Sequence, residues 1–272
     1  MTTATHQARV YPSRPSDVYL FSTCLIDQFT PEAGLDTVRL LEREGIRVHF
    51  PEQQTCCGQP AYSSGFPEEA RAVALQQLNL FTEPWPVVIP SGSCGGMIRN
   101  HYPHLFADDP VLHAQAVALS ERVYELSEFL VPVVNFSNPD LGATCTIALH
   151  TSCHARRQMG AHETSAALLD SLAQVRVVEQ ARIEECCGFG GTFAMRYPDI
   201  SEAIVNDKVA AIRDTGAERV VSADCGCLLN ITGRAAKQDE LAGVTAPTLH
   251  GEHLASFLYR RTTAQSNTGE VA

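Results

Sequence analysis

The chain has 272 residues, of which 44% are hydrophobic and 19% charged, a composition typical of a globular protein long enough for two domains. Its 20 Lys and Arg against 31 Asp and Glu give a net charge of −11, which argues against a nucleic-acid partner because phosphate binding needs clustered cations. No apolar run approaches the roughly 20 residues of a membrane-spanning helix, and residues 1–16 lack the apolar core of a secretory signal. We therefore expect a soluble, cytoplasmic protein without a membrane span.

Short apolar runs alternate with amphipathic stretches along the whole chain. The first predicted helix begins at Pro31 and ends at Gly45, which is typical helix punctuation. Later runs that are apolar and β-branched are bounded by polar residues or glycine, as buried parallel strands are. In chain order, the predicted helices cover about 31–45, 68–81, 111–130, 162–172 and 200–213, and the clearest predicted strands cover 146–149, 175–178 and 219–222.

This alternation predicts an α/β fold of two tandem repeats, each a small Rossmann-like parallel sheet with flanking helices, related by a pseudo-twofold axis. We place the first domain at 17–135 and the second at 143–258, because Pro132 and Pro139 interrupt the chain between them. The termini, residues 1–16 and 262–272, are expected to be mobile.

Nine of the ten cysteines fall into two sets with matching spacing. Each set has a single cysteine, then a Cys-Cys-Gly motif 32 or 33 positions later, then one or two further cysteines. The flanking residues repeat as well, since 18–24 aligns with 147–153 and 94–98 with 227–231, so the chain contains two copies of one domain. The sets are Cys24, Cys56, Cys57 and Cys94, and Cys153, Cys186, Cys187, Cys225 and Cys227.

Grouped cysteines in a reducing compartment indicate metal ligands or redox groups more than structural disulfides. Each cysteine loop follows a predicted strand, and ligands gather at the carboxyl ends of the strands in a parallel sheet. The three loops of each copy are therefore expected to converge, which predicts two pockets, one in each half. In this alignment Cys227 is the counterpart of Cys94, so Cys225 is an additional thiol.

Four motifs carry a resemblance to a known family. They are 56–62 (CCGQPAY), 91–97 (SGSCGGM), 186–193 (CCGFGGTF) and 226–231 (GCLLNI). The order of cysteines resembles the tandem cysteine-rich CCG domain, and the motifs are most similar to those of the lactate utilization protein A family over residues 17–258. A more distant similarity is to the heterodisulfide reductase B subunit and to the iron–sulfur subunits of enzymes that oxidise glycolate and glycerol 3-phosphate.

The resemblance implies an iron–sulfur electron-transfer subunit of a multi-subunit oxidoreductase that oxidises L-lactate to pyruvate without NAD. It implies partner subunits, one of them a ferredoxin-type iron–sulfur protein, and no activity of the chain alone. The fullest CCG motif ends in Cys-x-x-Cys, which supplies five thiols to a non-cubane cluster. This chain has Met97 and Asn230 at the last position, which argues against such a cluster and against disulfide-cleaving chemistry.

Four thiolates per site remain, the number that holds an ordinary two-iron or four-iron cluster. The predicted ligands are Cys24, Cys56, Cys57 and Cys94 in the first half, and Cys153, Cys186, Cys187 and Cys227 in the second, with a 4Fe-4S cluster as the favoured cofactor. Zinc in one site is an alternative, although zinc sites usually draw on a Cys-x-x-Cys knuckle that neither copy has. Two further functions stay open, a heterodisulfide-type thiol reductase and an interaction module held together by zinc.

Several other residues invite a functional interpretation. We predict that Cys145 is a core residue, and that Cys225 is a ligand, a resolving thiol or a bystander. His154 follows a predicted ligand and could tune the centre, whereas His250 and His253 are expected to serve packing and capping. The glycine-rich run 188–191 follows a cysteine pair instead of opening a strand–helix unit, which argues against nucleotide binding. No catalytic residue is identified.

Overall fold

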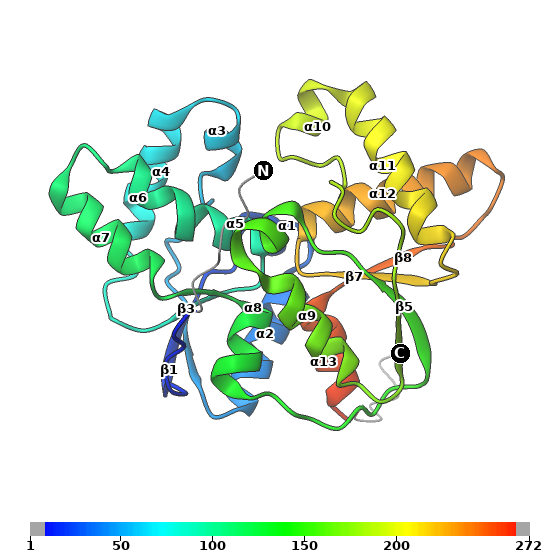
Figure 1. Cartoon of the computed structure of the whole chain (residues 1–272), viewed down its shortest axis with the longest axis horizontal. Helices are drawn as coiled ribbons and strands as arrows, with labels where there is room; N and C mark the ends of the chain where they lie inside the picture. Colours follow the sequence, from blue (N-terminus) through cyan, green and yellow to red (C-terminus); the bar gives the residue numbers. More distant parts are fainter. Residues whose placement is uncertain (1–8, 265–272) are drawn as a thin grey trace, which may run out of the picture.

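The structure is a computed structural model that describes residues 9–264. It contains two four-stranded parallel sheets with the same strand order, β2-β1-β3-β4 and β6-β5-β7-β8 (Figure 1). The strands are β1 (Asp17–Leu20), β2 (Arg47–His49), β3 (Val87–Ile89), β4 (Val123–Glu125), β5 (Cys145–Leu149), β6 (Val175–Val178), β7 (Arg219–Ser222) and β8 (His250–His253). The identical order confirms the α/β class and the internal repeat.

Helices connect the strands and cover both sheets. In the first half they are α1 (Cys24–Phe29), α2 (Pro31–Arg43), α3 (Gln59–Ser63), α4 (Pro67–Leu78), α5 (Gly92–Gly96), the π-helical turn η1 (Met97–His101), α6 (Tyr102–Leu105), α7 (Pro110–Ser120), α8 (Leu126–Phe129) and the π-helical turn η2 (Leu130–Val134). In the second half they are the π-helical turn η3 (Ala155–Met159), α9 (Ala161–Asp170), α10 (Phe193–Arg196), α11 (Pro198–Arg213), α12 (Cys225–Leu241) and α13 (Leu254–Thr262). Within residues 9–264, none of these helices combines the length and the apolar character needed to cross a bilayer.

The predicted elements are present, with one correction between 111 and 130. The helix expected there ends at Ser120, and the strand β4 and the helix α8 follow it. Val123 pairs with Val87 and Glu125 with Ile89, so this segment completes the first sheet. A strand of three residues is too short to show a two-residue period beside a strong helical pattern. The strand β8, which completes the second sheet, was missed because its four residues, His250–His253, include no apolar side chain.

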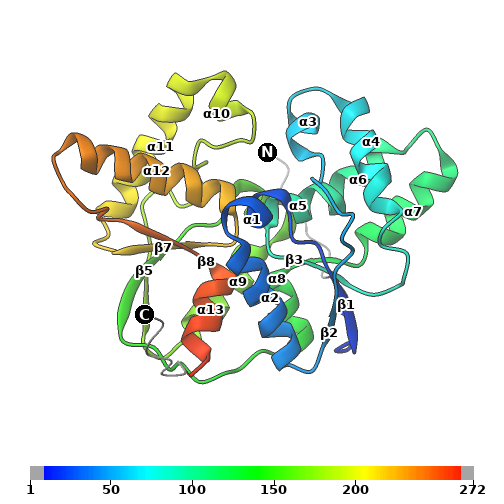
Figure 2. The same cartoon turned by 180° about the vertical axis from the view of Figure 1, so that it is seen from behind.

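The two halves share one hydrophobic core. Helices α2, α8, α9 and α13 lie between the sheets in both views (Figures 1 and 2). Their buried side chains form a single cluster with residues of both sheets, for example Leu40, Phe129, Leu168 and Phe257. The proposed domain boundaries near 135 and 143 therefore stay a prediction, because the halves are joined by a continuous apolar interior.

Both ends of the chain extend past the described residues. Residues 1–8 and 265–272, which hold most of the termini expected to be mobile, lie outside the described part. Residues 9–16 run along the first half, where the Arg9 guanidinium donates to the backbone oxygens of Val123 and Glu121. The guanidinium also lies over the Tyr124 ring, 4.0 Å from its centroid.

Candidate metal centres

The first cysteine set comes from three loops at the carboxyl ends of neighbouring strands. Cys24 begins α1 just after β1, the pair Cys56 and Cys57 lies between β2 and α3, and Cys94 is in α5 just after β3. Because β1, β2 and β3 are parallel neighbours, their carboxyl ends meet at one edge. The loop order thus brings together four cysteines that are up to 70 positions apart.

The four thiols of this set contact one another in a chain. The Sγ atoms of Cys57 and Cys94 are 3.2 Å apart. The Cys56 sulfur accepts hydrogen bonds from Cys24 and Cys57, which lower its pKa to about 3, and it lies 3.4 Å from the Gly58 amide nitrogen. The pKa of Cys24 is raised, first by its hydrogen bond to Cys56 and then by burial. The set therefore concentrates thiolate character on Cys56.

The second set repeats this arrangement. Cys186 accepts hydrogen bonds from Cys153 and Cys187, which lower its pKa, and its sulfur lies 3.3 Å from the Gly188 amide nitrogen. Cys187 also hydrogen-bonds to Cys227, which is buried at the start of α12. The pKa of Cys153 is raised, first by its hydrogen bond to Cys186. The eight predicted ligands thus form two equivalent groups of four.

Glycine after each cysteine pair is required by the backbone. Gly58 has φ of 83° and Gly188 has φ of 86°, in the left-handed region that favours glycine. A Cβ added at Gly188 would lie 2.7 Å from the Ser201 carbonyl oxygen, and one at Gly58 would lie 3.2 Å from the Ala70 carbonyl oxygen. A side chain at either position would therefore strain the loop that carries the cysteine pair.

Both groups line one cavity, which corrects the expectation of two separate pockets. The cavity holds about 310 Å³, and every cysteine except Cys145 contributes to its wall. The halves meet closely around it, because a Cβ on Gly92 of α5 would lie 2.3 Å from the Cβ of Ala155. At the rim, the hydroxyls of Ser64 and Thr192 are 2.5 Å apart. The two candidate centres therefore face a common space between the repeats.

The second group has a polar neighbour that sequence analysis missed. His150 follows β5 directly, is 1% exposed, and has a ring nitrogen within 4.8 Å of the sulfurs of Cys187 and Cys227. Burial lowers the pKa of His150 to about 4, so the ring is neutral at physiological pH. The alignment of 147–153 with 18–24 contained the signal, an imidazole three positions before a predicted ligand.

The remaining thiols have different surroundings. Cys225 lines the cavity, yet its sulfur accepts from the Thr30 hydroxyl at 3.5 Å and contacts the Leu25 carbonyl oxygen at 3.6 Å, so it is directed toward α1. Cys145 begins β5, away from the cavity, and its sulfur lies 3.5 Å from Nη1 of Arg261. These positions favour a bystander role for Cys225 and a structural role for Cys145.

Polar side chains at or near the positions that depart from the five-thiol motif support the backbone of the cysteine pairs. Asn230 donates through Nδ2 to the Cys187 carbonyl oxygen at 2.8 Å, and Met97 is fully buried. In the first half, the Tyr102 hydroxyl donates to the Cys57 carbonyl oxygen at 3.0 Å. In each half a side chain near this position thus holds the carbonyl of the second cysteine of the pair.

The other predicted residues lie as follows. Nδ1 of His154 is 3.5 Å from the Cys153 sulfur, so this ring contacts the second group. His253 is buried and its Nδ1 accepts from the Ala255 amide, which confirms a capping role, while His250 is exposed. Gly190 and Gly191 have positive φ and line the cavity wall, so the glycine-rich run shapes this cavity.

The donor set fits a soft metal or an iron–sulfur cluster. Each group offers four sulfurs from three loops, a ligand type preferred by iron–sulfur clusters and zinc, while magnesium and calcium prefer oxygen. Amide groups donate to one sulfur of each group, as expected where thiolate charge must be stabilised.

The sequence matches a known domain family and several proteins that share one name. A model of the cysteine-rich CCG domain matches residues 18–99 and 147–232. Proteins named lactate utilization protein A are 45% identical over 225 residues in Bacillus subtilis, covering 82% of this chain and 93% of that protein, and 43% identical over 244 residues in Shouchella clausii, covering 89% and 98%. The protein of that name from Geobacillus kaustophilus is 46% identical over 222 residues, covering 81% and 92%.

One solved structure resembles the fold. A hypothetical protein from Helicobacter pylori superposes with a TM-score of 0.67 at 10% sequence identity, over 95% of this chain. This chain spans about half of that structure, 52% of its length. At this identity the likeness concerns the fold alone.

Proposed function

The chain belongs to the lactate utilization protein A family of tandem CCG cysteine-rich domains, and on this premise we propose that it is an iron–sulfur electron-transfer subunit in L-lactate oxidation. Its predicted ligands are the eight cysteines of the two groups. Its predicted partners are the other subunits of a lactate-oxidising complex, including a ferredoxin-type iron–sulfur protein.

One observation carries this proposal. Two groups of four thiols, built by equivalent loops of the two repeats, line the same cavity. A protein that only needed zinc to fix its loops would gain nothing from placing both centres against a shared space. Two redox centres gain a short path between them, so the arrangement supports electron transfer.

The chain prepares each site in ways that suit this role. Iron–sulfur clusters, when bound, supply one-electron transfer at potentials set by hydrogen bonds to sulfur, local charge and exposure. The Gly58 and Gly188 amides donate to the sulfurs of Cys56 and Cys186. Cys57 and Cys187 are buried, so the side of each site that they form is shielded from water. Cys186, in contrast, is exposed. The exposed side is where we expect a partner subunit to approach.

A growth experiment tests the role in lactate oxidation. The gene is deleted in its host, and growth on L-lactate as the sole carbon source is measured after complementation with the wild type, C57S, C187S or C145S. We expect the wild type and C145S to restore growth and both cavity variants to fail, with all strains growing equally on glucose. Normal growth on L-lactate by the deletion strain would contradict the proposal.

A further inference from the structure

The two repeats differ at one buried position beside the cysteines. Phe21 and His150 are each the first residue after a central strand, and their amides donate to equivalent carbonyl oxygens, those of Val88 at 3.0 Å and Val221 at 2.8 Å. Phe21 is 0% exposed and packs in the core cluster that contains Cys57 and Cys94. His150 thus lies beside the second group where the first has a phenyl ring.

The imidazole of His150 is buried without a polar partner. Among residues 9–264, neither ring nitrogen has a hydrogen-bond partner, although a buried polar group without one is costly. The sulfurs of Cys187 and Cys227 lie within 4.8 Å of a ring nitrogen, and the Asp224 carboxylate and the Cys186 sulfur also act on the ring electrostatically. The nearby ammonium of Lys208 is already used, because it donates to the Arg182 carbonyl oxygen at 2.7 Å.

Metal binding changes what these sulfurs offer. Cys187 and Cys227 hydrogen-bond to each other as thiols. A ligand cysteine is a thiolate, which has no proton to donate and accepts hydrogen bonds strongly. The loaded site would therefore provide the acceptor that the neutral His150 ring lacks.

Building on the function proposed above, we propose that His150 is a positioning residue of the second centre, whose ring N–H donates to the thiolate of Cys187 or Cys227. Such a hydrogen bond withdraws negative charge from the sulfur and favours the reduced state. The second centre consequently has the higher reduction potential of the two, and electrons that enter at the first centre pass to the second.

A second difference between the repeats would also raise the reduction potential of the second centre. Gly58 packs against Ala70 and Val73 of α4, and Gly188 packs against Ser201 and Ile204 of α11. Aligning Ala70 with Ser201 and Val73 with Ile204 makes Lys208 the counterpart of Gln77. Both side chains are buried, so the second half also carries a positive charge where the first has an amide. The test must therefore isolate the imidazole from Lys208.

The repeats supply a reciprocal pair of variants, H150F and F21H. Each protein is purified anaerobically, and its two centres are followed by electron paramagnetic resonance during a redox titration. We expect H150F to lower the higher potential toward the other one, and F21H to raise the lower potential. Unchanged potentials in both variants would overturn the role of His150.

A spectroscopic measurement tests the contact itself. Protein labelled with ¹⁵N-histidine should show weak nitrogen coupling to one reduced centre, typical of an N–H···S contact, and H150F should lose the part that comes from His150 and keep any part from His154, which lies 3.5 Å from the Cys153 sulfur. Strong coupling would reveal a direct metal ligand, and no coupling would remove the contact, so either result overturns the proposal. Iron analysis separates failure of the proposed function from failure of the role of His150. Absence of iron defeats the proposed function, whereas normal iron with unchanged potentials defeats only the role of His150.

Discussion

Asp224 of the second half accepts a hydrogen bond from the Ser93 amide of the first half at 2.9 Å. The same carboxylate oxygen accepts from the Ser91 hydroxyl, also at 2.9 Å. Asp224 precedes α12, which carries Cys227, and Ser93 precedes Cys94 in α5. A single buried carboxylate at the start of α12, which carries Cys227, thus bonds to residues at the start of α5, which carries Cys94.

The variant D224A removes this link. We expect it to lower the free energy of unfolding by about 2 kcal/mol, because a buried amide and hydroxyl lose a charged acceptor. D224N, which keeps an acceptor oxygen, should lose less. D27A, at an exposed position, is the control and should change stability by less than about 0.5 kcal/mol. Urea unfolding measures all three, and equal stability of D224A and D27A would contradict the account.

Gly92 tests how closely the halves meet. The variant G92A places a methyl group 2.3 Å from Ala155, and we expect it to destabilise the protein by about 1–3 kcal/mol because the tight contact must open. Gly233 in α12 is the matched control, since a Cβ there meets nothing within 4 Å. G233A should stabilise the protein by about 0.5–1 kcal/mol. Thermal unfolding of the pair decides, and a G92A protein as stable as the wild type would show that the halves are more loosely joined.

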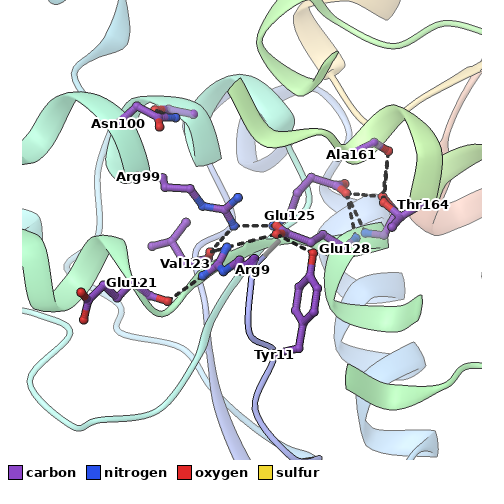
Figure 3. A network of polar contacts seen from close by, with 12 residues as sticks. Arg9, Tyr11, Arg99, Asn100, Glu121, Val123, Glu125, Glu128, Ala161 and Thr164 are labelled. Carbon is purple, nitrogen blue, oxygen red and sulfur yellow. Dashed lines mark hydrogen bonds and ion pairs between the residues drawn. The ribbon is translucent and has the colours of Figure 1, made fainter. Parts of the chain in front are cut away.

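A polar network joins the N-terminal segment, β4 and α8 (Figure 3). Glu128 pairs with Arg9 and Arg99. Glu125 caps α8 by accepting from the Ser127 amide at 2.7 Å, and the Ser127 hydroxyl continues to Thr164 at 2.8 Å. Burial raises the pKa of Glu125 to about 8.

This raised pKa predicts a pH-dependent stability. The folded protein keeps the Glu125 proton up to about pH 8, while the unfolded chain loses it near pH 4.5. Stability contributed by this proton is therefore complete below pH 4.5 and is lost as the pH rises through about 8. E125Q removes the titration, so its melting temperature relative to that of the wild type should rise between pH 5 and 8. A constant difference over this interval would refute the assignment.

The ligand assignment predicts different outcomes for different cysteines. C57S and C187S should each lose the iron of one centre, about half of the total, because each removes a sulfur from the inner side of its group. C145S and C225S should keep the full iron content, since Cys145 lies away from the cavity and Cys225 is directed toward Thr30. Iron per chain after anaerobic purification gives the answer, and a large loss in C225S would make Cys225 a ligand.

Much of the fold could be predicted because the matching spacings of the cysteines reveal the internal repeat. Cys24 and Cys153, with the pairs after them, mark the ends of parallel strands, so their convergence followed from chain order alone. The strand β4 was hidden, since Val123–Glu125 is short and continues a helical pattern. Its place in the sheet depends on pairing with β3, a contact that no local pattern encodes.

The shared cavity and the role of His150 could not be predicted for a related reason. The meeting of the halves depends on contacts such as Gly92 with Ala155 and Asp224 with Ser93, between residues 63 and 131 positions apart. A glycine or an aspartate in isolation does not indicate such a contact. His150 was visible in the alignment with Phe21, but its importance comes from burial and from the missing partner, which only the structure provides.

Anaerobic analysis of iron, acid-labile sulfide and zinc in the purified chain decides whether the two cysteine groups hold iron–sulfur clusters. We expect iron and sulfide in equal amounts, about four of each per loaded centre, with a visible absorption that dithionite bleaches. A colourless protein that contains zinc near two per chain and no labile sulfide would contradict this expectation.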